Sequence, residues 1–263
     1  MADGTAQLER AGARSVRAGE VAIVVPCFNE AGRLTPEAFL RFARTERSVR
    51  FVFVDDGSTD ATRALLEQLC TLDPGSFQLI AQPRNTGQGE AVRAGVARAL
   101  AGGARYVGYW DADLATPLDE IRRFAGVLDR EPGCLVVLGS RKPHPDNRVH
   151  RHPLRFALGR AFAWSAATLL RMRVYDTQCG AKLFRATPET AALFGAAFIS
   201  RWIFDVEILV RLIRARGSVH AARAAIHEQS LEAWRDVAGS KLKPLDFARA
   251  PWELLKIGLQ LYR

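Results

Sequence analysis

Two aspartates, Asp111 and Asp113, directly follow the apolar run Tyr106–Trp110. Such a run is typical of a buried strand, and polar side chains that follow it lie at the carboxyl edge of a parallel sheet. Because side chains alternate along an extended chain, both carboxylates point the same way and repel each other. A divalent cation would relieve this repulsion, since Mg²⁺ binds one or two carboxylates together with substrate phosphates. A solvated turn is the alternative interpretation.

Three further polar clusters follow strand-like runs in the same manner. They contain Pro26, Phe28, Glu30, Asp55, Asp56, Asn85, Gly87 and Gly89. Since parallel strands end at one edge of a sheet, these clusters and the aspartate pair should converge on one crevice. The chain has no Walker A loop and no G-x-G-x-x-G sequence after its first predicted strand, which disfavours an ATPase or a dehydrogenase. A nucleoside-diphosphate substrate held by a metal and carboxylates fits better.

The elements that position these clusters alternate between strand and helix. Strands are predicted at 21–25, 51–54, 77–80, 106–110 and 135–139, with amphipathic helices between them. Two helix starts carry a proline signal, Thr35-Pro36 and Thr116-Pro117. This order predicts an α/β fold with a Rossmann-like, doubly wound, mostly parallel sheet and helices on both faces.

A basic segment, residues 141–155, follows the last of these strands. It contains Arg141, Arg155 and three histidines, and its prolines predict a loop. A solvated charge run is one interpretation. The segment also joins the predicted crevice to the apolar helix 156–172, and an acceptor with a phosphate head and a lipid tail would need both features.

Composition narrows the possible classes of protein. The chain has 263 residues, 48% of them hydrophobic, and a net charge of +9, which favours phosphorylated ligands or an anionic membrane surface. The basic residues are not interleaved with aromatics as in nucleic-acid-binding modules, so we expect no nucleic-acid partner. The four cysteines are far apart, which predicts free thiols in a cytosolic protein. Residues 1–19 lack the apolar core of a signal peptide and predict a mobile arm.

The polar clusters together resemble glycosyltransferase family 2 with its GT-A fold. The nucleotide-sugar half of that family is matched by Val24–Glu30, Val54–Asp60, Asn85–Gly89 and Asp111–Asp113. The polyprenyl-phosphate (dolichyl-phosphate) glycosyltransferases, and their β-glucosyltransferase branch, are matched by Gly139–Arg141, Asp176–Gly180, Trp234 and Gly239–Leu242. The resemblance covers residues 20–243, which predicts one GT-A domain there and an amphipathic helix at 244–263.

The resemblance implies an inverting, metal-dependent transfer of a hexose to a polyprenyl phosphate. Glucose is the expected sugar and UDP-glucose the expected sugar donor. Pro26, Phe28, Glu30 and either Asp55 or Asp56 would hold the base and ribose, with Asn85, Gly87 and Gly89 beside them. Asp111 would lie near the ribose and phosphates, and Asp113 would bind Mg²⁺ or Mn²⁺. Asp111, Asp113, Arg141 and Lys241 form the implied catalytic set, and Lys241 would reach the diphosphate of the sugar donor.

On the acceptor side, the resemblance implies Arg141, Arg155, Asp176 and Ser240. The sequence departs from the branch at two positions, with Leu114 in place of glycine and Ala181 in place of phenylalanine. It also has no apolar run near the ~20 residues that span a bilayer, whereas the eukaryotic relatives carry a membrane-spanning segment. These differences leave the sugar and the lipid open.

Charge determines the expected mechanism. A phosphate monoester is largely dianionic at neutral pH, because its second pKa is about 6, so it can attack the anomeric carbon without a general base. A hydroxyl acceptor on a glycolipid or saccharide is the alternative; it needs a base, and Asp176 is the candidate unless it caps a helix or pairs with an arginine. A non-catalytic protein that binds sugar nucleotides is a third hypothesis.

The site of action is expected to be a membrane surface. We predict a cytoplasmic protein bound peripherally to the inner face of the cytoplasmic membrane. Two amphipathic elements would make the contact. They contribute Phe162, Trp164 and Leu169 from helix 156–172, and Trp252, Leu255 and Leu259 from the C-terminal helix.

Overall fold

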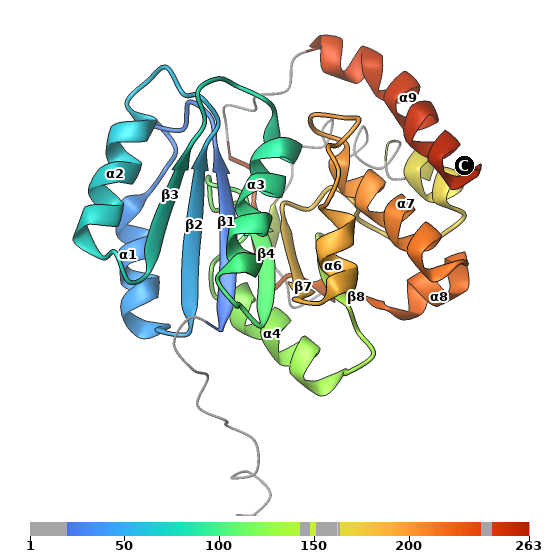
Figure 1. Ribbon diagram of the computed structural model, residues 1–263, viewed down its shortest axis with the longest axis horizontal. Coiled ribbons are helices and arrows are strands. Elements are labelled where there is room, and N and C mark those ends of the chain that lie inside the picture. Colours follow the sequence, from blue (N-terminus) through green and yellow to red (C-terminus); the bar gives the residue numbers. More distant parts are fainter. Residues whose placement is uncertain (1–19, 143–147, 151–161, 163, 238–243, 263) are drawn as a thin grey trace, which may run out of the picture.

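The computed structural model describes residues 20–142, 148–150, 162, 164–237 and 244–262. Its main sheet has the strand order β3-β2-β1-β4-β7-β5-β8 (Figure 1). The strands are β1 (Val21–Cys27), β2 (Val49–Asp55), β3 (Phe77–Ala81), β4 (Tyr106–Trp110), β5 (Val136–Ser140), β7 (Ala181–Arg185) and β8 (Ile226–Ser230). All are parallel except β7, which lies antiparallel between β4 and β5. A second, parallel pair joins β6 (Arg148–His150) to β9 (Ala233–Arg235).

Helices cover both faces of this sheet, as the strand–helix alternation predicts. They are α1 (Pro36–Thr45), α2 (Thr62–Leu72), α3 (Gln88–Ala101), α4 (Glu120–Arg130), α6 (Pro188–Leu193), α7 (Phe204–Arg216), α8 (Val219–Ala224) and α9 (Pro244–Leu259), which continues as the 3-10 turn η1 (Gln260–Tyr262). Residues 164–170 are also helical. Within the described ranges, no helix has the length and apolar character needed to cross a bilayer.

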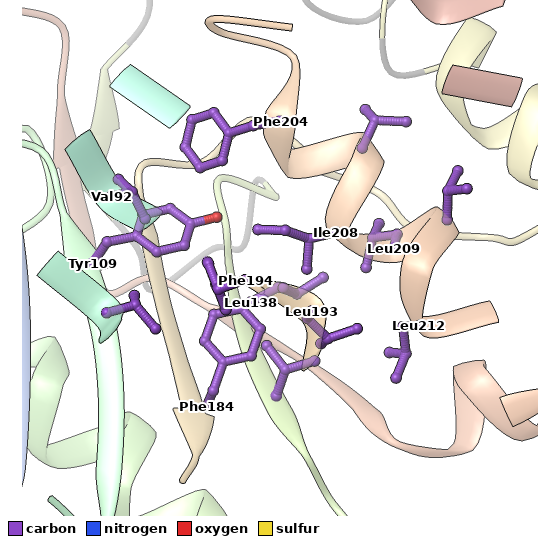
Figure 2. Packing of buried hydrophobic residues seen from close by; sticks show 14 of the residues in the cluster. Val92, Tyr109, Leu138, Phe184, Leu193, Phe194, Phe204, Ile208, Leu209 and Leu212 are labelled. Carbon is purple, nitrogen blue, oxygen red and sulfur yellow. The ribbon is translucent and has the colours of Figure 1, made fainter. Parts of the chain in front are cut away.

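Two apolar clusters hold the layers together because alternate strand residues point to opposite faces. Ile23 and Phe51 pack with α1, α2 and α4, whereas Val24 and Val52 pack with α3 and α7. Around Tyr109, the second cluster consists mainly of aromatic and branched side chains from β4, β7, α6 and α7 (Figure 2). These layers fix the strand ends at which the predicted polar clusters lie.

The helix predicted from Thr116-Pro117 begins later, at Glu120. The carbonyl of Thr116 accepts the indole N–H of Trp110 at 3.0 Å, and residues 118–119 form a turn before the helix. At the other predicted start, Pro36 is the first residue of α1, but the Thr35 side chain makes no capping hydrogen bond. The proline signal therefore located one start and missed the other by one turn.

A tight turn at Gly57 places the loop after β2 against the loop after β3. Gly57 has φ +70°, and a Cβ built on it would lie 2.5 Å from the carbonyl carbon of Arg84. A residue with a side chain therefore meets both a left-handed backbone and a steric clash. The turn brings Asp56 and Asn85 to one wall of the crevice.

We predict a graded series of alanine substitutions at glycines. Gly32→Ala, which meets open space without a positive φ, should leave stability unchanged; Gly103→Ala, with φ +72° and open space, should cost about 1 kcal/mol. Gly57→Ala adds the clash and should cost at least about 2 kcal/mol. Thermal unfolding of the three variants measures this order, and equal losses at Gly57 and Gly103 would contradict the clash.

Candidate functional site

The predicted crevice is a cleft of about 730 Å³ at the carboxyl ends of β1, β2 and β4. Segment 194–203, α9 and the strand β9 supply its other walls. Nine predicted site residues line it: Pro26, Phe28, Glu30, Asp56, Asn85, Gly87, Asp111, Asp113 and Arg141. Arg155, Ser240 and Lys241 lie outside the described residues. The structure therefore brings most of the predicted residues together.

Three predicted residues do not line the cleft and instead support it. Asp55 is 1% exposed and accepts the Ser58 backbone N–H at 3.0 Å. Gly89 donates its N–H to the carbonyl of Arg201 at 3.0 Å, and a Cβ on it would lie 3.0 Å from Cβ of Phe204 at the start of α7. Asp176 is buried behind Arg141. Of the adjacent aspartates, Asp56 is the one on the cleft wall.

Asp56 fixes the loop that carries Asn85 and Gly87. Its Oδ1 accepts the backbone N–H of Thr86 at 2.7 Å and the Thr86 hydroxyl at 2.9 Å, while its Oδ2 accepts the Gly87 N–H at 2.8 Å. Hydrogen bonds from N–H groups to a carboxylate are strong and orienting. The loop after β3 is thereby held across the end of β2.

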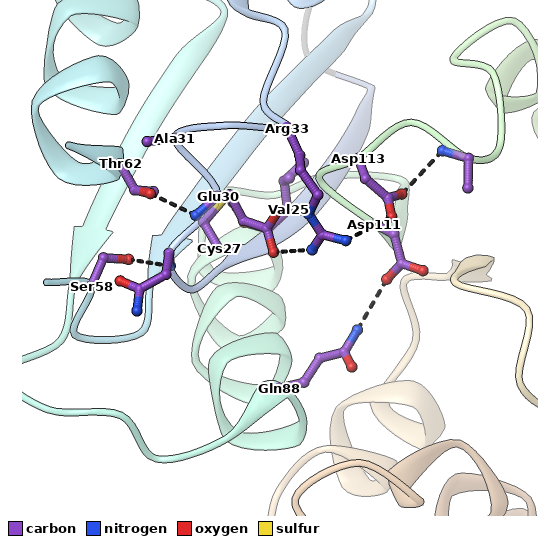
Figure 3. Close-up of polar contacts among 12 residues, drawn as sticks. Val25, Cys27, Glu30, Ala31, Arg33, Ser58, Thr62, Gln88, Asp111 and Asp113 are labelled. Atoms are coloured by element: carbon purple, nitrogen blue, oxygen red, sulfur yellow. Dashed lines mark hydrogen bonds and ion pairs between the residues drawn. The ribbon is translucent and has the colours of Figure 1, made fainter. Parts of the chain in front are cut away.

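Arg33 links the first polar cluster to the aspartate pair (Figure 3). Its Nε and one amino nitrogen donate to Glu30 at 2.8 and 2.5 Å, and the other amino nitrogen lies 3.5 Å from Oδ2 of Asp113. Asp113 Oδ1 accepts the Ala115 N–H at 3.1 Å. Sequence reasoning missed Arg33, because a single arginine in a loop has no distinguishing spacing.

Asp111 packs tightly against Gly180, the residue that precedes β7. Its backbone N–H donates to the carbonyl of Gly180 at 2.9 Å, and a Cβ on Gly180 would lie 1.7 Å from Oδ2 of Asp111. Gln88, at the start of α3, donates to Oδ1 at 3.0 Å (Figure 3). Only glycine at position 180 allows this approach.

The charge state of Asp111 is strongly perturbed. Burial, followed by the nearby charges of Asp113 and Asp205, raises the pKa of this carboxyl to about 7, although Lys182 and Arg141 act in the opposite direction. An ionised carboxylate in this place is therefore costly unless a further positive charge is present.

A buried network lies behind Asp111. The ammonium of Lys182, 1% exposed, donates to Oδ1 of Asp205 at 2.6 Å and to the carbonyl of Cys179 at 2.7 Å. The Tyr109 hydroxyl also donates to Asp205, and burial raises the pKa of this tyrosine well above its usual range. The network joins β4, β7 and α7, and sequence reasoning assigned no role to Lys182 or Asp205.

Arg141 lines the cleft directly after the end of β5. Its Nε and one amino nitrogen donate to the two oxygens of Asp176 at 2.6 and 2.8 Å, and its guanidinium carbon lies 5.2 Å from the centre of the Trp234 ring. This bidentate pair corresponds to the arginine-partner interpretation of Asp176. It orients Arg141 in the cleft wall.

The aspartate pair fits a divalent cation that is shared with a substrate. Among the described residues, no group of three or more His, Cys, Asp or Glu side chains is placed to hold a metal. Mg²⁺ and similar hard cations need only one or two carboxylates when phosphates and water complete the shell. Burial and the charge of Asp113 raise the pKa of Asp111, and a cation bound here would favour the ionised form of the pair.

Comparison with known proteins agrees with this geometry. The chain is 32% identical over 238 residues to a dolichyl-phosphate beta-glucosyltransferase of Dictyostelium discoideum, covering 85% of this chain and 69% of the relative. It is 29% identical over 241 residues to the Saccharomyces cerevisiae protein of that name, covering 84% and 69%.

Solved structures share the fold at low identity. Glucosyl-3-phosphoglycerate synthase of Mycobacterium tuberculosis in complex with UDP aligns with a TM-score of 0.63 and 18% identity, covering 90% of this chain and 79% of that chain. The same enzyme with Mn²⁺, UDP-glucose and phosphoglyceric acid aligns with a TM-score of 0.64 and 16% identity over the same shares. The family model described as "Glycosyl transferase family 2" matches residues 22–192. The chain belongs to glycosyltransferase family 2, and its sheet is that of the GT-A fold.

Proposed function

We propose that this protein transfers glucose from UDP-glucose to a polyprenyl phosphate. The observation that carries the proposal is the cleft itself. It is lined by residues suited to a base and ribose (Pro26, Phe28 and Asp56), by the aspartate pair and by Arg141. The relatives at about 30% identity over most of the chain are named for glucose transfer to dolichyl phosphate. The catalytic domain here would act on the same class of acceptor.

The nucleotide would bind along the ends of β1 and β2. Pro26, Phe28 and Asp56 line that wall, which offers an apolar surface and a carboxylate for the base and ribose. The diphosphate would then extend toward Asp111 and Asp113. A cation held by Asp113 and the diphosphate would stabilise the negative charge that develops on departing UDP.

The chemistry needs no protein base. An oxygen of the acceptor phosphate attacks the anomeric carbon, the bond from that carbon to the UDP oxygen breaks, and direct attack inverts the configuration. The phosphate dianion carries no proton that must be removed. Arg141 would hold the acceptor phosphate, since its guanidinium is oriented by Asp176 and stacked near Trp234.

The hydroxyl-acceptor alternative is less well supported by this geometry. A hydroxyl nucleophile needs a base, and the candidate was Asp176. Both oxygens of Asp176 accept hydrogen bonds from Arg141, and the residue is 6% exposed. A carboxylate in that position orients an arginine and does not reach a substrate hydroxyl.

The proposal is tested by incubating the protein with labelled UDP-glucose, undecaprenyl phosphate and Mg²⁺ or Mn²⁺. We expect a glucosylated lipid phosphate, with loss of activity in EDTA and in Asp113→Ala. Glu67→Ala, an exposed carboxylate on α2, is the matched control and should retain full activity. If product forms only with a hydroxyl-terminated lipid, the acceptor is a hydroxyl and not a phosphate. Full activity in EDTA would show that transfer needs no divalent metal.

Asp111→Asn should abolish transfer while making the fold more stable above pH 7. The raised pKa means that ionisation of Asp111 destabilises the folded state, so this penalty is absent below about pH 4 and complete above pH 7. Because the carboxylate faces a solvated cleft, we expect the free energy of unfolding of Asp111→Asn to exceed that of the wild type by about 1–2 kcal/mol at pH 8. At pH 4 we expect no difference between the two proteins. Thermal melts of both proteins at the two pH values measure this. A variant less stable than the wild type at pH 8 would contradict the charge argument.

We also propose that the protein binds peripherally to the inner face of the cytoplasmic membrane, through α9 and helix 164–170. The two helices touch, since a Cβ on Gly258 would lie 2.3 Å from Leu169. Their exposed apolar side chains are Trp164 (71%), Trp252 (60%), Leu255 (49%) and Leu259 (51%). Phe162 and Leu169, which were also expected at this surface, are only partly exposed because they pack against the core.

The membrane proposal is tested by flotation with vesicles that contain anionic lipid. The combined variant Trp252→Ser, Leu255→Ser, Leu259→Ser should lose about a hundredfold or more in partitioning, at roughly 1.5 kcal/mol per apolar side chain. Leu72→Ser removes an equally exposed leucine (62%) on α2 and serves as the control. Binding should also weaken at high salt. Equal flotation of both variants would remove α9 from the contact.

A further inference from the structure

Four arginines line the cleft among the described residues, and they differ in their partners. Arg33 pairs with Glu30 and Asp113, and Arg141 pairs with Asp176. Arg201 and Arg249 make no ion pair with a described carboxylate. The first two guanidinium groups are thus neutralised by protein carboxylates, whereas the other two present charge to the cleft.

Arg201 lies across the start of α3. A Cβ on Gly87, which has φ +105°, would lie 2.7 Å from Cβ and 2.8 Å from Nε of Arg201. One amino nitrogen donates to the carbonyl of Asn85 at 3.4 Å and to its side-chain oxygen. The remaining N–H groups of Arg201, on Nε and on the second amino nitrogen, donate to no described residue, so they are available to a ligand.

The backbone that carries Arg201 is held by three helices. Segment 194–203 joins α6 to α7, and carboxylates from α3, α7 and α9 bind it. The contacts are Phe198 N to Glu90 Oε1 at 2.8 Å, Ile199 N to Glu207 Oε2 at 2.8 Å, and Ser200 Oγ to Glu253 Oε2 at 2.6 Å. Hydrogen bonds to carboxylates fix the segment firmly. The arginine is therefore positioned before any ligand arrives, which lowers the entropic cost of binding.

Arg249 reaches the same rim from α9. It lies four residues before Glu253, so the two side chains share one face of the helix. Glu253 bonds to Ser200, the neighbour of Arg201, and both Arg249 and Glu253 line the cleft. Arg249 and Arg201 therefore line one cleft, and Glu253 on the same face of α9 bonds to the neighbour of Arg201.

We propose that Arg201 and Arg249 form a binding pair for a phosphoryl group of a substrate, separate from Arg141. Two guanidinium groups with free N–H donors match the oxygens of a phosphate, which guanidinium binds in a bidentate manner. Asp111 and Asp113 line the same cleft, so an anion is repelled by these carboxylates and attracted to the two arginines. The inference rests on the proposed function for its two possible sources, the diphosphate of UDP-glucose and the phosphate of the lipid.

Arg201→Gln and Arg249→Gln test the pair, with Arg63→Gln on the exposed face of α2 as the matched control. The dissociation constant of UDP, measured by calorimetry with Mn²⁺, reports the sugar-donor side. The apparent KM for undecaprenyl phosphate reports the acceptor side. We expect each cleft variant to raise either the dissociation constant of UDP or the KM for undecaprenyl phosphate about tenfold or more. The control variant should change neither constant. Arg201→Lys, which keeps the charge but loses the planar fork, should recover only part of the loss.

The outcomes separate this inference from the proposed function. A rise in the UDP constant assigns the pair to the sugar donor, and a rise in KM alone assigns it to the lipid phosphate. Unchanged values in both folded variants overturn the pair. If the wild type binds UDP but glucosylates no lipid phosphate, the proposed function fails, and the UDP measurement still decides whether Arg201 and Arg249 bind a phosphoryl group. A wild type that binds neither UDP nor the lipid phosphate overturns both.

Discussion

The position of the Asp111 carboxylate is the constraint on which the rest of the site depends. This group lies at the end of β4 beside a second aspartate, and burial makes its charge costly. The antiparallel strand β7 lowers the cost of this buried charge in two ways. Its register sets Lys182 opposite Tyr109 and Ala181 opposite Trp110, so Gly180 falls against Asp111. Glycine gives the carboxylate room, and Lys182 supplies a buried positive charge beneath it.

The same strand explains why Asp205 and Tyr109 are polar inside the core. A buried ammonium needs a counter-charge and hydrogen-bond partners, or its burial costs several kcal/mol. Asp205, from the start of α7, pairs with Lys182, and Tyr109 completes the bonds to that carboxylate. The sheet, α7 and the cleft floor are thereby tied through one network. Replacing any one of its members would leave the other buried polar groups without their partners.

The strand ends and the polar clusters were predictable from sequence because each follows a continuous apolar run. Adjacent residues were harder to separate: β2 ends at Asp55, Asp56 follows it, and only Asp56 lines the cleft wall. The direction of β7 and its place between β4 and β5 are not encoded locally, because they depend on contacts with distant strands. Arg33, Gln88 and Arg201 were missed because isolated polar residues in loops and at helix starts gain a role only through tertiary contacts.

Helix α9 presents three different faces, whereas its sequence predicted two. Ala250, Leu254 and Ile257 are buried against the core, while Trp252, Leu255 and Leu259 are exposed. The third face carries Arg249 and Glu253 into the cleft. One rigid element thus joins the surface proposed for the membrane to the rim of the active site. Under the membrane proposal, the helix that contacts the bilayer would also carry Arg249, one of the two arginines proposed to bind a phosphoryl group.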